Sequence, residues 1–153
     1  MKQVKVNKKY ILVGVAVFLV AAQFFKIDKT NPPVVAEQDF IEIENPSADI
    51  STRLMSTCYD CHAHTTTYPW YTDVAPVSWW VKRHINLGRE KLNFSLWGSY
   101  TDNEKAHKLD ECVEYTSKGW MPLGSYRWMH PEANMSDADR VALVQYFESL
   151  KLR

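Results

Sequence analysis

A pair of cysteines and a histidine stand together in the run Cys58-Tyr59-Asp60-Cys61-His62. On a helical turn, the two-residue gap brings both thiols to one side at a separation that suits the two vinyl groups of haem. The histidine that follows can then supply the proximal nitrogen to the iron. Because the pattern occurs once in the chain, we predict one covalently bound haem c, attached through Cys58 and Cys61 with His62 as the proximal iron ligand.

The iron of an electron carrier usually has a second axial ligand, and we predict Met121 in this role. Met121 follows Gly119, where a helix is expected to end, and precedes Pro122, so it would lie on a stiff loop. Such a loop can hold a weak thioether ligand against thermal motion. Two alternatives stay open, namely His84, on the apolar side of a predicted helix, and Met129, whose neighbours favour packing instead.

Further contacts with the haem are predicted from side chains near the motif. Tyr68 and Trp70 follow it closely and are expected to line the haem edge, where a hydroxyl or indole N–H could bond a propionate. Arg89, or alternatively Arg83, could neutralise the charge of a propionate. The alternative for all four residues is ordinary surface or core packing.

The third cysteine, Cys112, lies beside Leu109 and Val113 on the inward side of a helical pattern. We predict that it is a small buried apolar side chain. A reactive or dimer-forming thiol is the alternative.

Two alternative interpretations of the motif do not involve haem. Cys58 and Cys61 could form a redox dithiol, or they could bind zinc together with His62 and His64. Zinc sites usually draw their ligands from two separated pairs, and redox dithiols usually follow a strand. The sequence offers neither context, so haem attachment is favoured.

A nearly apolar run extends from Tyr10 to Phe25 and follows a lysine-rich start. We predict a transmembrane anchor over residues 10–25, about 24 Å long as a helix against a hydrocarbon core of about 30 Å, with residues 1–9 in the cytoplasm. The alternative is a cleaved signal peptide with Val20-Ala21-Ala22 as the cleavage site. The prediction places a single-pass protein in the bacterial inner membrane, with the haem domain in the periplasm or outside.

Residues 26–45, with Asn31-Pro32-Pro33, are predicted to be a linker, and residues 46–153 a single haem-binding domain. The chain has 153 residues and a formal net charge of zero, which argues against nucleic acid as a partner. Its 6 Trp and 8 Tyr suit a pocket around a flat macrocycle.

The spacing of apolar residues predicts an all-α domain with four helices. The first begins at Ser47 or Asp49 and carries the cysteines, and the second runs from about Pro76 to Gly88. The third is predicted over residues 101–118, with a capping box at its start, and the last begins at Ser136. We find no convincing strand alternation.

These residues resemble a family of small bacterial haem-binding domain proteins related to cytochrome c. The resemblance covers about residues 46–150 and is carried by the C-x-x-C-H run and by Thr67-Tyr-Pro-Trp-Tyr71, Ala75-Pro-Val-Ser-Trp79, Gly88-Arg89, Leu92-Asn-Phe-Ser95, Gly119-Trp-Met-Pro122 and His130-Pro-Glu-Ala133. It implies a small cytochrome c-like helical fold around one haem, with iron ligation by His62 and a methionine at position 121.

The function predicted from these features is that of a membrane-tethered carrier of single electrons with an unidentified redox partner protein. No catalytic constellation is visible, so we do not expect an enzyme. A haem-based sensor or gas-binding module with a weak or open sixth site is the alternative.

Overall fold

Residues 7–152 are described by the structure, a computed structural model in which every regular element is a helix or a helical turn. Within this range there is no strand, which confirms the predicted all-α class. The chain divides into two compact units. One unit contains the chain up to Thr30 together with Tyr68–His84, and the other contains Asn31–Thr67 together with the chain from Ile85 onward.

The first unit is built around α1 (Lys8–Ala22), a helical turn (Trp70–Asp73) and the first part of α5 (Val77–Lys91). The Gln23 side-chain amide bonds both backbone groups of Ala75: its Nε2 donates to the carbonyl at 2.9 Å, and its Oε1 accepts from the N–H at 3.1 Å. These polar contacts fix the chain just beyond the C-terminus of α1.

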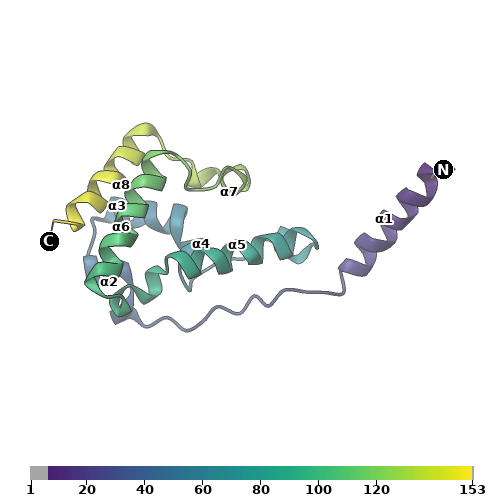
Figure 1. Cartoon of the computed structure of the whole chain (residues 1–153), viewed down its shortest axis with the longest axis horizontal. Helices are drawn as coiled ribbons and strands as arrows, with labels where there is room; N and C mark the ends of the chain where they lie inside the picture. The colour runs from purple at the N-terminus through teal and green to yellow at the C-terminus, as the bar shows by residue number, and fades with distance from the viewer. Residues whose placement is uncertain (1–6, 153) are drawn as a thin grey trace, which may run out of the picture. The chain divides into compact units, whose positions relative to one another are not determined.

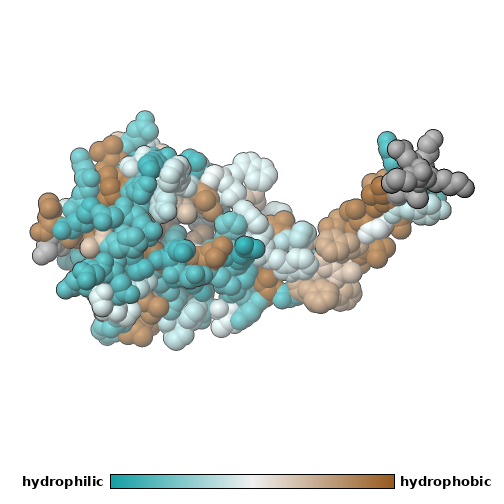
Figure 2. Space-filling view, viewed as in Figure 1, coloured by the Kyte–Doolittle hydropathy of each residue, from teal (hydrophilic) through white to brown (hydrophobic). Residues whose placement is uncertain are grey.

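Helix α1 is apolar on most of its surface, as the brown cylinder in Figure 2 shows. It has 15 residues, so it is about 22 Å long, against a hydrocarbon core of about 30 Å. Phe24 and Phe25 lie beyond its end. Among residues 7–152, no helix is both long and apolar enough to cross a membrane. This finding contradicts the predicted anchor over residues 10–25 and the single-pass inner-membrane location, while residues 1–6 lie outside the described range.

The second unit contains the remaining helices. They are α2 (Phe40–Glu44), α3 (Ala48–Leu54), α4 (Asp60–His62), α6 (Asp102–Ser117), α7 (Gly124–Met129) and α8 (Asp137–Leu150), with shorter turns at Ala36–Gln38, Met55–Tyr59, Phe94–Ser99 and Pro131–Ala133. Helices α6 and α8 pack side by side, and α3 also packs on α8 (Figure 1). Helix α3, the turn at Met55–Tyr59 and α4 follow one another along the chain with no loop between them.

The core of this unit is aromatic at its centre. Phe40, Phe94 and Trp97 are each almost completely buried, and the Phe40 ring meets the other two edge to face at centroid distances of 5.0 and 4.9 Å. Tyr59 stacks on Phe94 at 5.3 Å, which joins the segment of the predicted haem motif to the core. Phe40 lies in the stretch predicted to be a linker, so the core of this unit begins earlier in the chain than residue 46.

Two of the predicted helices differ in their limits. Helix α5 does not stop at Gly88 but continues to Lys91. The predicted first helix is interrupted between α3 and α4 by a π-helical turn at Met55–Tyr59. By contrast, the capping boxes at the starts of α6 and α8 are formed by Thr101 with Glu104 and by Ser136 with Asp139, as their sequences predict.

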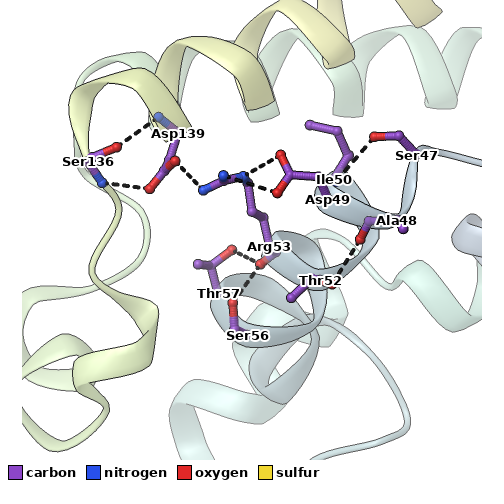
Figure 3. A network of polar contacts seen from close by, with 10 residues as sticks. All are labelled: Ser47, Ala48, Asp49, Ile50, Thr52, Arg53, Ser56, Thr57, Ser136 and Asp139. Carbon is purple, nitrogen blue, oxygen red and sulfur yellow. Dashed lines mark hydrogen bonds and ion pairs between the residues drawn. The ribbon is translucent and has the colours of Figure 1, made fainter.

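A polar network ties the start of the motif segment to α8 (Figure 3). Arg53 lies between Asp49 on its own helix and Asp139 on α8, and it forms ion pairs with both carboxylates. Asp139 also accepts a hydrogen bond from the Ser136 N–H at 3.0 Å, so one carboxylate caps α8 and docks α3. This arrangement fixes the helix from which the cysteines extend.

Candidate functional site

Cys58 lies at the end of the π-helical turn, and Cys61 and His62 lie on α4. The hydroxyls of Ser56 and Thr57 both donate to the carbonyl of Arg53, at 3.1 and 2.6 Å (Figure 3). Hydroxyls that bond a carbonyl in the preceding turn compete with the backbone ladder and are found where helices deform. A π-helical turn of this kind is frequent at functional sites, because it re-aims the side chains that follow it.

Both motif cysteines are unpaired thiols with half-buried side chains. Burial raises the pKa of Cys58 to about 11. Burial also raises the pKa of Cys61 to about 11, with the negative charge of Asp60 acting in the same direction and Arg89 acting against it. Both groups are therefore thiols at neutral pH. Redox-active dithiols usually have a lowered pKa, so these values disfavour the dithiol reading.

The His62 ring is held by a backbone acceptor. Its Nδ1 lies 3.0 Å from the carbonyl oxygen of Leu92, and the Gly88 carbonyl is also close to the ring. Burial lowers the pKa of His62, although these two carbonyls oppose the shift, so the ring is neutral at pH 7. A proton on Nδ1 that is donated to Leu92 leaves the lone pair on Nε2, which is the arrangement of a metal-ligating histidine.

Gly88 allows α5 to lie directly against the motif. A Cβ at this position would be 2.6 Å from the carbonyl oxygen of Cys61 and 3.2 Å from its carbonyl carbon. Only glycine permits this approach of helix to backbone. The sequence signal of Gly88 therefore reflects close packing inside α5 and not the end of the helix.

The loop that follows the motif is fixed by Arg89, which was predicted to meet a propionate. Its Nε donates to the Ala63 carbonyl at 2.8 Å, and its Nη2 donates to Thr66 Oγ1 at 2.8 Å and to Asn31 Oδ1 at 2.9 Å. These bonds join Arg89 to the loop after the motif and to Asn31. Arg89 holds the backbone beside the thiols, and its proposed role toward a propionate stays a prediction.

Met121 lies in the same unit as the motif, half-buried on the loop between α6 and α7. Its N–H donates to the carbonyl of Tyr115 at 3.2 Å. Farther along this segment, the Tyr126 hydroxyl donates to the Asp60 carboxylate at 2.7 Å, so α7 is bonded to the motif itself. The role of Met121 as an iron ligand stays a prediction.

The roles predicted for four other residues toward the haem or its iron also stay predictions. Tyr68, Trp70 and His84 belong to the first unit. There the Tyr68 hydroxyl accepts from Lys82 at 3.3 Å, the His84 Nδ1 lies 2.8 Å from the Trp80 carbonyl, and Trp70 is 73% exposed. Met129, the alternative methionine ligand, is exposed at the end of α7.

The remaining cysteine and histidine of the alternative readings have other surroundings. Cys112 packs against the hydrophobic core, and burial raises the pKa of its thiol, as expected for a structural cysteine. His64 is bonded away from the thiols, with Nδ1 3.0 Å from the Pro33 carbonyl and Nε2 accepting from Asn93 at 2.8 Å. Across residues 7–152, no three His, Cys, Asp or Glu side chains converge to hold a metal ion, which disfavours the zinc reading.

The residues of the site fit a haem. Two unpaired thiols lie within one helical turn, and the adjacent imidazole has its Nδ1 bonded to a carbonyl. The model of the family described as haem-binding domain matches residues 17–149. The chain belongs to the haem-binding domain family. No curated protein and no solved structure matches the chain significantly.

Membership of the haem-binding domain family gives the protein a haem cofactor and a haem-related function. The match extends well beyond the motif and includes Met121 and Tyr126. Three contributors to the site could not be read from the sequence: the Leu92 carbonyl, the Asp60–Tyr126 bond and the contact of Gly88 with Cys61. Of these, only Gly88 has a side-chain identity that signals its role.

Proposed function

We propose that this protein carries single electrons by means of one haem, covalently attached to Cys58 and Cys61, and that it is not an enzyme. The iron of the haem supplies reversible one-electron redox chemistry. His62 would hold the iron through Nε2, and Met121 would supply the second iron ligand. A redox partner protein would supply or accept the electron.

The observation that carries this proposal is the environment of His62. A histidine directly after two unpaired thiols has its Nδ1 within 3.0 Å of a backbone carbonyl, which fixes the tautomer and the ring plane. Burial keeps the ring neutral and therefore able to donate its Nε2 lone pair. Cys58 and Cys61 are both free thiols, so both are available for attachment.

The assignment of Met121 is supported by its position on a segment whose two sides are bonded to structured parts of the same unit. Arg140 donates to the carbonyls of Thr116 and Met121, at 2.7 and 3.5 Å, before α7 begins. Tyr126 on α7 bonds Asp60. A thioether is a weak ligand for ferric iron, so its segment must be held in place.

The proposal is tested by expressing the full chain together with a haem-attachment system. Haem that stays with the protein after denaturing extraction, and is lost in the Cys58→Ala/Cys61→Ala variant but not in Cys112→Ala, supports covalent attachment.

The absorption spectrum tests the function as an electron carrier. A low-spin spectrum with a sulfur-to-iron charge-transfer band supports this function. The band should disappear in Met121→Ala and persist in the matched control Met129→Ala. A high-spin spectrum with rapid binding of carbon monoxide contradicts the carrier and favours a sensor or gas-binding module.

A further inference from the structure

The second variable residue of the motif is part of a hydrogen-bond network. One oxygen of the Asp60 carboxylate accepts the N–H of Thr67 at 2.9 Å, and the other accepts the Tyr126 hydroxyl at 2.7 Å. The Asp60 carbonyl oxygen accepts the Thr66 hydroxyl at 2.6 Å. The acceptor of the Tyr126 bond is therefore held in place by the loop after the motif.

The Tyr126 side chain, which supplies the donor of this bond, is also held in place. The Tyr126 ring stacks on His130 with centroids 4.2 Å apart and planes 13° apart. The ring is half-buried, and burial together with the Asp60 carboxylate raises the pKa of the hydroxyl, which favours its protonated, donating form. A hydrogen bond to a charged acceptor at this distance is among the stronger kinds.

The position of this bond in the chain connects it to Met121, the proposed iron ligand. Helix α7 begins at Gly124, directly after the Met121-Pro122-Leu123 loop. The other side of the loop is anchored at the end of α6, where the carbonyl of Tyr115 accepts the N–H groups of both Trp120 and Met121. The Tyr126–Asp60 bond joins α7, on the far side of this loop, directly to the haem-attachment motif.

We propose that Tyr126 and Asp60 form a latch that positions the Met121 segment against the haem-attachment motif and so sets how firmly Met121 stays on the iron. Neither residue is a ligand; both are positioning residues. This inference rests on the proposed function, because it requires Met121 as the distal ligand. An external ligand can bind the iron only in molecules whose Met121 has left it, so its apparent affinity reports how often the latch opens.

The test is an imidazole titration of the ferric full-length holoprotein, followed by the loss of the sulfur-to-iron band. Tyr126→Phe keeps the ring and its stacking on His130 but removes the donor. We expect apparent imidazole binding to become about tenfold tighter, with unchanged covalent haem content. The matched control is Tyr115→Phe, which removes a hydroxyl from the other side of the loop and should bind imidazole as the wild type does.

A second variant separates the latch from a general loosening of the fold. Asp60→Asn keeps an acceptor without the charge, so a smaller tightening is expected, and the double variant should equal Tyr126→Phe instead of adding the two effects. If Tyr126→Phe loses its helical circular dichroism, the latch is tested instead by comparing the imidazole affinity of Asp60→Asn with that of the wild type.

The failures of the two proposals are distinguishable. If the wild type has the band and loses it in Met121→Ala, while imidazole affinity is the same in Tyr126→Phe, Asp60→Asn and wild type, the latch is wrong and the carrier stands. If the spectrum of Met121→Ala is that of the wild type, Met121 is not the ligand, and both the ligation and the latch are overturned.

Discussion

At the scale of single residues, the proposed haem site depends on the groups that hold the proposed ligands as well as on the proposed ligands themselves. His62 is oriented by the Leu92 carbonyl, and the chain beside Cys61 is held by Arg89. Such supporting bonds fix ring orientation and loop geometry, and their loss commonly weakens a metal site without removing a ligand.

Arg89→Ala should destabilise the fold more than it changes the redox potential. The substitution leaves the Ala63 carbonyl, the Thr66 hydroxyl and the Asn31 amide oxygen without the donors they have now. We expect the free energy of unfolding to fall by about 2–3 kcal/mol, because hydrogen bonds to charged groups are worth more than neutral ones but are not additive. Urea unfolding of the holoprotein measures the change.

The matched control is Arg83→Ala, which removes the same charge from an exposed position on the same helix and should change stability by less than about 0.5 kcal/mol. A large change in reduction potential with little change in stability in Arg89→Ala would instead indicate that the guanidinium serves a haem propionate, as the sequence first suggested.

The residues with reactive side chains could be predicted from the sequence, whereas their partners could not. The C-x-x-C-H run names Cys58, Cys61 and His62 directly. The acceptor for His62 is a backbone oxygen, and every residue offers one, so no sequence pattern identifies Leu92. Asp60 and Tyr126 are far apart in sequence, and only the fold brings them within 2.7 Å.

At the scale of elements, α5 and the motif are in unusually close contact at Gly88. A methyl group there would lie 2.6 Å from the Cys61 carbonyl oxygen, a distance that forces the backbone of one element to move. Helix propensity alone would favour alanine by up to about 1 kcal/mol. We expect the clash to outweigh this gain, so Gly88→Ala should destabilise the protein by about 1–3 kcal/mol and reduce the yield of attached haem.

Gly14→Ala is the matched control for this substitution, because Gly14 also lies inside a helix but has nothing within 4 Å of the added Cβ. It should leave haem yield unchanged and stability equal or slightly higher. Thermal unfolding and haem staining of both variants give the comparison. Equal behaviour of the two alanine variants would show that α5 can move away from the motif at no cost.

The junction of α3 and α8 should make the protein sensitive to acid. The Ser136 N–H holds the pKa of Asp139 below its usual value, and the Ser136 hydroxyl and the Arg53 charge act in the same direction. Because the pKa is lower in the folded state, the carboxylate contributes stability above the unfolded pKa of about 3.9, and this contribution is lost as the pH falls through the folded pKa.

Asp139→Asn should therefore flatten the dependence of unfolding free energy on pH between about pH 5 and pH 3, as followed by urea unfolding at each pH. Asp137→Asn, in the same first turn of α8, makes the same charge change without the Arg53 ion pair and serves as the control. Parallel curves for wild type and Asp139→Asn would mean that the network in Figure 3 contributes nothing in acid.

Helix starts could be predicted at this scale, but helix interiors could not. The capping boxes at Thr101 and Ser136 use local side chains, and both are present in the structure. The π-helical turn that contains Cys58 is accompanied by bonds from the Ser56 and Thr57 hydroxyls to the Arg53 carbonyl, and such bonds form only once the helix has formed. Helix α5 continues beyond Gly88, where it packs against Cys61. The spacing of apolar residues along the chain does not indicate this contact.

At the scale of the whole molecule, the two units share the residues that the sequence assigned to one haem site. Cys58, Cys61, His62 and Met121 belong to one unit, and Tyr68 and Trp70 to the other. Tyr68 and Trp70 are assigned to the haem from their closeness to the motif along the chain, and this role stays a prediction. The membrane anchor predicted from hydropathy over residues 10–25 is contradicted, because the helix ends at Ala22 and is too short to cross a membrane.

The charge balance of the chain predicts how the proposed carrier meets its redox partners. Lys and Arg number 18, as do Asp and Glu, so the formal net charge is zero. A neutral protein is not steered strongly by long-range fields. We expect the rate constant for reduction by a small anionic reductant to change by less than about threefold between 10 mM and 150 mM salt, where the Debye length falls from about 30 Å to about 8 Å.

Lys118 offers a local test of the same expectation in stopped-flow reduction of the ferric protein. It lies 4.5 Å from the ring centre of Trp120, which is 54% exposed and adjacent to Met121. If electrons enter beside Met121, Lys118→Glu should slow an anionic reductant and speed a cationic one, because the reversed charge acts near the point of entry. Lys151→Glu is the matched control, since each lysine pairs with one carboxylate and each substitution changes the net charge equally. Equal effects of the two variants would place electron entry away from Trp120, and a steep salt dependence in the wild type would show that local charge outweighs the neutral total.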